Sequence, residues 1–424
     1  MEKLKAELYD KLNYMVKTNY FDGTIHGYLK FSGLIDKNVL SEALQFMIDK
    51  IPVLHSRFQY HKIKPYWQVE NYNINDALYY EECSNPEELA NEHILTTLDE
   101  NSNLRIKIKI FTDNKISIMV ILIDHACIDG DDFKYFIKTL FKNYNSIINN
   151  TEKIAPKNGP RGIDQIYNDF SPLDKIKAKN LITYPRYENK TYFPWSKAEE
   201  NAINILIRKK LENNDLLKLE KIIEKKDITL TDSVLAAMIK SLYELDKNQE
   251  IISIASIVNL RRYIKEADQT TGMTNYFSLM GIKITASSTI EDILKEVTDQ
   301  TKKEKNKKFF ALNGIPLLTF AFKYLPFFIA LPIVKNNYVD AKVSLSSMGE
   351  LKKEEYQLEG IELNDFFISG AIKYKPYFLM SCTTFNDELS FSAAIKGTET
   401  DKKILDEYLD KVLENLKKII EKGA

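Results

Sequence analysis

Residues 123–133 read IDHACIDGDDF and form the stretch that decides the fold. The run before it, KISIMVIL at 115–122, is almost continuously apolar, which is typical of a strand inside a sheet. The residues after it, 131–149, return to the spacing of an amphipathic helix, and two aspartates suit its positive N-terminal end. The sequence therefore predicts a buried strand, a short loop that begins at His125, and a helix.

The loop offers residues that could carry chemistry. His125 stands where the buried strand ends and would face the cleft beyond the sheet. A neutral imidazole can accept a proton near pH 7, as a general base must. Asp129 would hold the loop through a buried salt bridge, and Gly130 leaves the backbone open to close approach of a substrate. On chemistry alone, a catalytic base and a satisfied structural histidine both stay open.

Two other interpretations use the same residues. Cys127 could act as a nucleophile, but a buried, inert thiol is the commoner state of such a residue. His125 and Asp129 could both bind a metal ion, yet no further ligand sits at a recognisable spacing, so no metal is expected. The remaining histidines have no motif around them and are expected at the surface or in turns: His26, His55, His61 and His93.

The rest of the chain mixes strands and helices without a regular βαβ repeat. LRIKIKIF at 104–111 alternates like a half-buried antiparallel strand. Residues 149–200 lose periodicity and are rich in proline, as a linker is. Helix and strand patterns then resume and include a late hairpin, PYFLMSCTTF followed by ELSFSAAIK. We predict an α+β fold of two similar-sized halves, 1–175 and 176–424, each a mixed, largely antiparallel sheet with helices.

Composition narrows the class of protein. A length of 424 residues makes two domains the default, and a formal net charge of -1 argues against a protein that coats nucleic acid. Only 14 glycines are present, and no glycine-rich phosphate-binding motif occurs. The three cysteines, Cys83, Cys127 and Cys382, are scattered and odd in number, and the charged N-terminus lacks the apolar core of a signal peptide. A reduced, cytoplasmic protein is expected.

One apolar stretch is long enough to cross a bilayer. Residues 314–334 read GIPLLTFAFKYLPFFIALPIV and contain Lys323 and three prolines. A lysine and three prolines oppose a membrane-spanning helix. We expect a buried or tunnel-lining segment of a soluble protein, with peripheral membrane contact as the alternative.

The motif and its surroundings resemble a known superfamily. HxxxDG, from His125 to Gly130, is the active-site signature of chloramphenicol-acetyltransferase-like enzymes, which include alcohol acetyltransferases and condensation domains of peptide synthetases. The segment GLIDKNVLSEALQFMIDKIPVLHSRF at 33–58 is similar to the opening strand, helix and turn of that group. More loosely, SIVNLRRYI, TNYFSL and VSLSSMGEL in the second half resemble its Arg-bearing strand, Asn-bearing turn and late serine-containing element.

The resemblance implies an acyltransferase that transfers groups other than aminoacyl groups. An acyl thioester would enter a tunnel between the halves from one side, and an alcohol or amine from the other. Condensation domains carry a second histidine where this chain has Asp124, which favours the alcohol-acetyltransferase-like branch. The alternatives are a stand-alone condensation enzyme acting on carrier-bound substrates and a catalytically idle module that binds a carrier protein.

The resemblance also implies roles for particular residues. His125 would be the general base, and no covalent acyl-enzyme would form. Asp129 would point away from the reacting atoms and bind an arginine of the second half, with Arg261 preferred over Arg262. Candidates for binding the substrate or the oxyanion are left open and comprise Asn275, Ser346 and Ser347.

No permanently bound cofactor is expected. Acyl-coenzyme A or an acyl-phosphopantetheine carrier protein would be the co-substrate, and the sequence leaves that choice open. The basic cluster at 302–308 could meet the phosphates of coenzyme A or an acidic carrier, although a solvated helix end is the simpler interpretation. A small-molecule acceptor is expected, and no nucleic acid.

Overall fold

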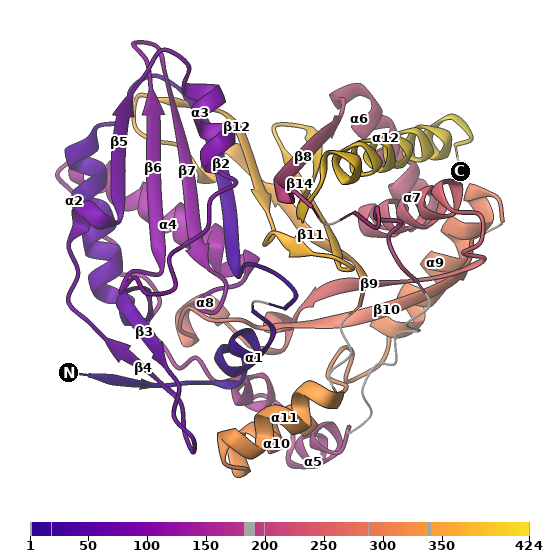
Figure 1. Ribbon diagram of the computed structural model, residues 1–424, viewed down its shortest axis with the longest axis horizontal. Helices are drawn as coiled ribbons and strands as arrows, with labels where there is room; N and C mark the ends of the chain where they lie inside the picture. The colour runs from indigo at the N-terminus through magenta and orange to yellow at the C-terminus, as the bar shows by residue number, and fades with distance from the viewer. Residues whose placement is uncertain are drawn as a thin grey trace.

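The computed structural model describes residues 2–17, 19–181, 191–198, 200–286, 288–337 and 341–423. Figure 1 shows two sheets side by side, each covered by helices. Both sheets mix parallel and antiparallel strand pairs: antiparallel pairs predominate in the five-stranded sheet, and the described strands of the seven-stranded sheet form three pairs of each kind. The predicted α+β class with two sheet-and-helix halves is therefore confirmed.

The first half contains a five-stranded sheet in the order β12–β2–β7–β6–β5. Only β5 and β6 run parallel in it. Its elements are β2 (Thr24–Ser32), α2 (Lys37–Lys50), β5 (Leu78–Glu82), α3 (Pro86–His93), β6 (Ile106–Thr112), β7 (Ile116–Asp124) and α4 (Gly130–Ile148). The helices form because apolar residues recur on one face of each, and Asp36 and Asp129 cap the N-termini of α2 and α4.

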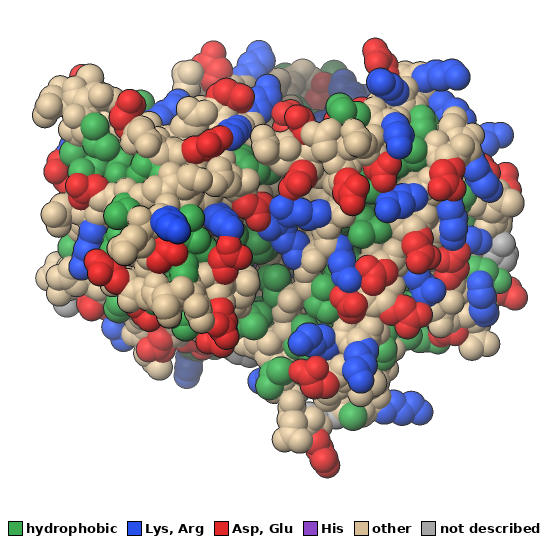
Figure 2. Space-filling view, turned by 90° about the horizontal axis from the view of Figure 1, so that it is seen from above, with side chains coloured by type: hydrophobic (Ala, Val, Ile, Leu, Met, Phe, Trp, Pro, Cys, Tyr) green, Lys and Arg blue, Asp and Glu red, His purple; other side chains and the backbone are tan. Residues whose placement is uncertain are grey.

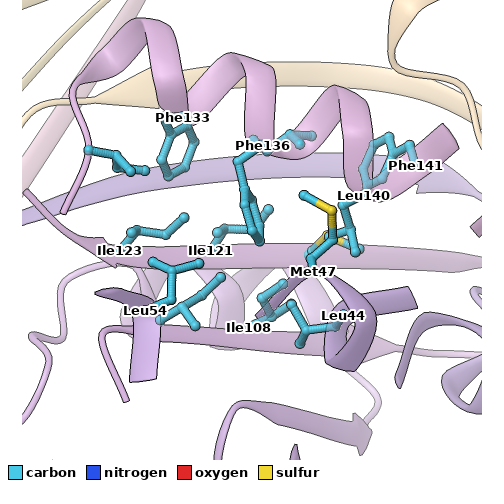
Figure 3. Packing of buried hydrophobic residues seen from close by; sticks show 14 of the residues in the cluster. Leu44, Met47, Leu54, Ile108, Ile121, Ile123, Phe133, Phe136, Leu140 and Phe141 are labelled. Carbon is cyan, nitrogen blue, oxygen red and sulfur yellow. The ribbon is translucent and has the colours of Figure 1, made fainter. Parts of the chain in front are cut away.

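The strand β7 is buried on both faces, which explains its continuous apolar run. Ile121 and Ile123 belong to the core under α2 and α4, whereas Val120 and Leu122 pack on the side of α3. Figure 3 shows Phe133 and the other apolar side chains of α4 lying over β7. This packing fixes the strand end, and with it the position of the residues that follow.

The second half contains a seven-stranded sheet. Six strands follow the order β10–β9–β11–β14–β15–β13, and β8 pairs with β15. Its strands are β8 (Ile203–Leu211), β9 (Ile251–Asn259), β10 (Phe277–Thr285), β11 (Val343–Leu351), β13 (Lys373–Tyr374), β14 (Phe378–Phe385) and β15 (Glu388–Gly397). Its helices are α6 (Asn213–Lys226), α7 (Leu230–Leu245), α8 (Ala267–Thr270), α9 (Ile290–Lys305) and α12 (Glu399–Glu421). The predicted late hairpin is present as β14 and β15.

One strand of the late sequence belongs to the first sheet. β12 (Glu362–Ser369) pairs antiparallel with β2, as Figure 1 shows. The two halves are thus joined by backbone pairing as well as by side chains. The boundary at residue 175 stays a proposal. A strand from after this boundary, β12, pairs with a strand from before it.

A third, small sheet and several short elements lie below the first half in Figure 1. The sheet has the order β1–β4–β3. Its neighbours are the helix α1 and the proline-rich connection. The bounds are β1 (Lys3–Lys5), α1 (Leu8–Val16), η1 (Pro52–His55), β3 (Ser56–Gln59), β4 (Tyr66–Val69), η2 (Ile74–Asp76), η3 (Ile163–Tyr167), α5 (Pro172–Lys179), η4 (Leu260–Tyr263) and η5 (Lys353–Glu355). Parts of the predicted linker, 182–190 and 199, lie outside the described residues.

The apolar stretch at 314–334 forms two short helices, α10 (Ile315–Tyr324) and α11 (Phe327–Asn337). Their inner faces are buried, but Phe320 and Phe328 are 57% and 51% exposed. The expected buried or tunnel-lining segment is found only in part: Ile315 and Leu318 line a cavity, but the outer faces are exposed, because proline breaks the stretch into two helices that each cover the core with one side only. Among the described residues, no helix is long and apolar enough to cross a membrane.

Candidate active site

His125 follows β7 directly and is held by the backbone on both sides. Its amide donates to Gly23 O over 2.8 Å. Its ring Nδ1 lies 3.0 Å from Ile128 O. A carbonyl oxygen can only accept, so in the neutral ring Nδ1 carries the proton and Nε2 keeps its lone pair. No described residue forms a hydrogen bond with Nε2, so its lone pair is available to act as a base.

Two cavities meet at the imidazole of His125. The larger has a volume of about 390 Å³ and extends along the start of α4, β9 and the bulged part of β11. The smaller has a volume of about 130 Å³ and is enclosed mainly by α1, α10 and β10. Ile257, Phe277 and Leu379 line both cavities as well. The histidine therefore stands at the junction of two spaces that reach it from different parts of the fold.

The larger cavity has charged and hydroxyl groups among its apolar walls. Lys134, Arg262 and Lys305 contribute cationic side chains, and Ser346 and Ser347 contribute hydroxyl groups. Lys305 belongs to the basic cluster at 302–308, so one member of that cluster lines the cavity. Arg262, which the sequence offered as a fallback partner of Asp129, lies at this cavity instead.

Asp129 faces away from the imidazole and organises the loop. Its carboxylate accepts from the amides of Asp131 and Asp132, at 3.1 and 3.0 Å, and so caps α4. The other oxygen accepts from Tyr276 N at 2.8 Å and from Arg261 Nη1 at 2.7 Å, so the contact expected from the sequence is present. Burial opposes ionisation of Asp129, but the charge and hydrogen bond of Arg261 hold its pKa below the ordinary value.

A second buried carboxylate extends this cluster. Asp132 binds Arg261 Nη2 at 2.9 Å and Lys157 Nζ at 2.5 Å, and it accepts from Thr274 N at 2.6 Å. Burial raises the pKa of Asp132 to about 6, against the attraction of Arg261 and Lys157. The sequence placed Asp132 at a helix end, and its role in the cluster was missed. The feature that could have indicated it is a second acid in the first turn of a helix that follows a buried strand.

Gly130 lies at the wall of the larger cavity, against β11. A Cβ atom built there would stand 2.6 Å from Met348 Sδ. Lys134, one turn further along α4, donates to Met348 O at 3.0 Å. A side chain at position 130 would therefore have to push Met348 aside. The absence of a side chain lets the start of α4 approach the β11 bulge closely.

The three candidates for the oxyanion separate into two groups. Asn275 is buried and donates its amide to His125 O and Ala126 O, at 2.8 and 3.4 Å. Its amide nitrogen already binds the loop and it does not line either cavity, so it positions the loop rather than offering a donor to substrate. Ser346 and Ser347 line the larger cavity, and their hydroxyl groups remain candidates.

Cys127, Asp124 and His26 are buried and make contacts that support the fold. Cys127 is buried, its Sγ lies 3.6 Å from Val53 O, and burial raises the pKa of its thiol well above the usual value. Asp124 lies 3.5 Å from Arg105 Nη1 and is buried with it, outside both cavities. His26, expected at the surface or in a turn, is instead fully buried in β2, because that strand lies inside the sheet. Among the described residues, no group of three or more His, Cys, Asp or Glu could hold a metal ion.

Comparison with known proteins supports the fold. No family model matches the sequence, and no curated protein matches it. The structure is similar to the epimerization domain from the third module of tyrocidine synthetase B, with a TM-score of 0.70, 12% identity, and coverage of 100% of this chain and 98% of that one. It is also similar to polyketide synthase associated protein 5 from Mycobacterium tuberculosis, with a TM-score of 0.70, 14% identity, and coverage of 99% of both chains.

A third similar structure is the first condensation domain of the calcium-dependent antibiotic synthetase, in complex with a substrate analogue. Its TM-score is 0.69 at 15% identity, and the match covers 98% of this chain and 95% of that one. Such likenesses span the whole chain and concern the fold. The chain therefore has the fold of these condensation and epimerization domains, as the resemblance led us to expect.

Proposed function

We propose that this chain is an acyltransferase that moves an acyl group from a thioester to an alcohol or an amine, with His125 as the general base. The observation that carries the proposal is the imidazole at the junction of two cavities, with Nδ1 held by Ile128 O and Nε2 left without a partner in the described part of the chain. A base shared by two spaces suits a reaction between two substrates that enter separately.

The transfer needs no covalent acyl-enzyme. The acceptor oxygen or nitrogen attacks the thioester carbonyl while Nε2 of His125 takes its proton. The tetrahedral intermediate then collapses, the carbon–sulfur bond breaks, and the imidazolium returns the proton to the departing thiolate. The negative oxygen of the intermediate needs nearby donors, and Ser346 or Ser347 would supply one from the wall of the larger cavity.

The cavity linings favour an assignment of the substrates. The larger cavity, with Lys134, Arg262 and Lys305, suits the phosphate-bearing arm of coenzyme A or of a carrier protein. The smaller cavity is lined mostly by apolar side chains, with Lys373 and a few amide and hydroxyl groups among them, which suits a mainly apolar portion of a substrate. The proposal includes both acyl-coenzyme A and an acyl-carrier protein as the co-substrate.

Asp129, Gly130 and Arg261 have supporting roles in this proposal. The Asp129–Arg261 pair joins the loop that holds His125 to η4 of the second half. Gly130 keeps the start of α4 close to β11. None of the three needs to touch the reacting atoms, and their effect on rate would act through the position of His125.

The deciding experiment is an assay of acyl transfer. The wild-type chain and His125→Ala are mixed with acyl-coenzyme A or acyl-carrier thioesters and with a panel of alcohols and amines, and products are identified by mass spectrometry. Transfer from coenzyme A that is lost in His125→Ala supports the proposal. Transfer from carrier-bound substrates alone supports the stand-alone condensation enzyme. Binding of carrier protein without transfer supports the idle binding module.

A further inference from the structure

Exposed apolar side chains gather at one end of the molecule. This end is formed by the tip of the β3–β4 hairpin, α5, α10 and α11, at the bottom of Figure 1. Eleven of the nineteen exposed large hydrophobic side chains among the described residues belong to these segments and the adjoining α1. They are Tyr14, Tyr60, Ile63, Leu173, Ile176, Leu317, Phe320, Tyr324, Phe328, Ile329 and Ile333, between 38% and 69% exposed. We call this set the α10–α11 face.

The segments of the α10–α11 face are held together by backbone contacts. Phe327 N and Phe328 N donate to Ile63 O and Lys62 O of the hairpin tip, at 3.1 and 2.9 Å. Gly314 N, before α10, donates to Leu181 O after α5 at 3.2 Å. The face is therefore a continuous surface built from parts distant in sequence.

The α10–α11 face is also strongly cationic. Its segments 60–64, 172–181 and 314–337 contain seven lysines and a single acid, Asp174. Lys323 is paired with Asp164 of η3 at 3.2 Å, so an excess of five positive charges remains in a chain whose formal net charge is -1. The opposite face, seen from above in Figure 2, carries acidic and basic side chains interspersed. The charge and the exposed apolar groups are thus concentrated in the same place.

Each segment pairs lysines with exposed apolar side chains. The hairpin tip places Ile63 between Lys62 and Lys64, and α5 places Ile176 between Lys175 and Lys177. In α10, Lys323 lies beside Phe320 and Tyr324. Side chains of this kind enter the acyl boundary of a bilayer, while the flexible ammonium groups reach lipid phosphates.

We propose that the α10–α11 face docks on an anionic lipid bilayer without spanning it. A bilayer offers both a plane of negative charge and a hydrocarbon layer, and every segment of the face matches both. An acidic water-soluble protein would match the lysines. It would also need a separate apolar pocket for each helix and for the hairpin tip, whereas a hydrocarbon layer accepts all of these side chains at once.

Docking would also bring lipid close to the site. Ile315 and Leu318 of α10 line the smaller cavity, whereas Leu317 and Phe320 of the same helix are exposed on the face. A bilayer would then lie one helix away from the cavity that ends at His125. The inference that a lipid-borne substrate enters there rests on the proposed function; the docking itself does not.

Vesicle co-sedimentation of the full chain tests the docking independently of any acyl transfer. The vesicles are phosphatidylcholine alone, or phosphatidylcholine mixed with phosphatidylglycerol. We expect the chain to pellet with the anionic vesicles and to be released as salt concentration rises. A chain that stays in the supernatant with anionic vesicles overturns the proposal, even if acyl transfer is found.

Two pairs of substitutions locate the binding. We expect two double variants to lower the apparent affinity for anionic vesicles by at least roughly tenfold each. One is Phe320→Ser with Phe328→Ser, and the other is Lys62→Glu with Lys64→Glu. The matched controls are Ile154→Ser with Leu217→Ser, which are 47% and 45% exposed elsewhere, and Lys221→Glu with Lys225→Glu on α6. Circular-dichroism melting confirms that each variant folds.

Other results would assign the face differently. Equal pelleting of the α10–α11 variants and their controls overturns the proposal, because the binding would then lie elsewhere. A concentration-dependent dimer in sedimentation velocity that Phe320→Ser with Phe328→Ser abolishes, without vesicle binding by the wild type, assigns the face to a second copy. Binding of an acidic carrier protein with the same mutational pattern, again without vesicle binding, assigns it to that partner.

Discussion

The two cavities that meet at His125 differ in lining and in origin. The larger is bordered by the cationic residues Lys134, Arg262 and Lys305. The smaller is bordered by apolar residues of α1 and α10, among them Leu12 and Leu318. Three cationic side chains therefore line the larger space and one, Lys373, lines the smaller, and both spaces also have apolar walls.

Under the proposed function, this difference would let one residue serve two substrates of unlike chemistry. Lysine and arginine attract a phosphate-bearing arm by long-range charge, which salt weakens. Apolar walls select by the area they remove from water, which is insensitive to salt. Each substrate can then be recognised without a change in the base that both approach.

The largest effect is expected where the two cavities meet. His125→Ala should lower kcat by about 10²–10⁴-fold, which is the usual contribution of a general base. The cause would be the loss of proton transfer, so the melting temperature should stay near that of the wild type. Acyl-transfer kinetics and thermal melting of the same preparation check this. Near wild-type turnover by a fully folded variant would remove His125 from the mechanism.

The next largest effect concerns the ion pair beneath the larger cavity. Arg261→Ala should lower the free energy of unfolding by about 3–5 kcal/mol, because it removes the cation shared by the buried carboxylates of Asp129 and Asp132. Asp129→Ala should cost less, because Arg261 keeps its contact with Asp132. The double variant should lose less than the sum of the single variants. Denaturant unfolding of the four proteins measures this coupling, and turnover should fall together with stability. Strictly additive losses, or an Asp129→Asn protein that is stable but inactive, would contradict the supporting role.

A smaller effect, on KM for the phosphate-bearing substrate, should show which cavity binds that substrate. Lys305→Ala should raise KM for an acyl-coenzyme A by up to roughly fivefold, since a partly exposed charge contributes little energy. The increase should shrink at high salt and should be absent for a short thioester without phosphate. Lys307→Ala, exposed in the same basic cluster and outside the cavity, is the matched control. An equal increase for the phosphate-free thioester would break the assignment of the larger cavity to the phosphate-bearing arm.

The smallest effect is expected at Cys127. Cys127→Ala should keep turnover within about twofold of the wild type, because a buried thiol with a raised pKa is a poor nucleophile. Iodoacetamide labelling of the folded protein, followed by peptide mass spectrometry, should leave Cys127 and the buried Cys382 unmodified. Rapid alkylation of Cys127 with loss of activity would show that the loop opens toward solvent.

The sequence predicted those features that depend on local patterns. The continuous apolar run of β7, the following helix α4 and the hairpin β14–β15 all have short-range signals. The turn between the hairpin strands uses Asn386 and Asp387, which adopt positive φ angles of 50° and 57° as that kind of turn requires. The contact between Asp129 and Arg261 was predicted from the resemblance and not from spacing, because 132 residues separate the two.

Features that depend on distant contacts could not be predicted. The segment ELNDFFIS has a strand-like composition, but nothing local indicates that β12 joins the sheet of the first half. Asp132 resembled an ordinary residue of a helix start until Arg261 and Lys157 were brought beside it. The exposed side of 314–334 was missed because apolar composition gives no information on which face a neighbouring element covers.

The position of β12 has a consequence for how the protein is made. His26 of β2 is paired with Ser369, so one edge of β2 has no strand partner until almost the whole chain has left the ribosome. An unpaired strand edge is a template for aggregation, and pairing across so long a separation is slow. During synthesis the sheet of the first half therefore stays incomplete, with one edge of β2 exposed. It is completed only when β12 has been made and pairs with β2.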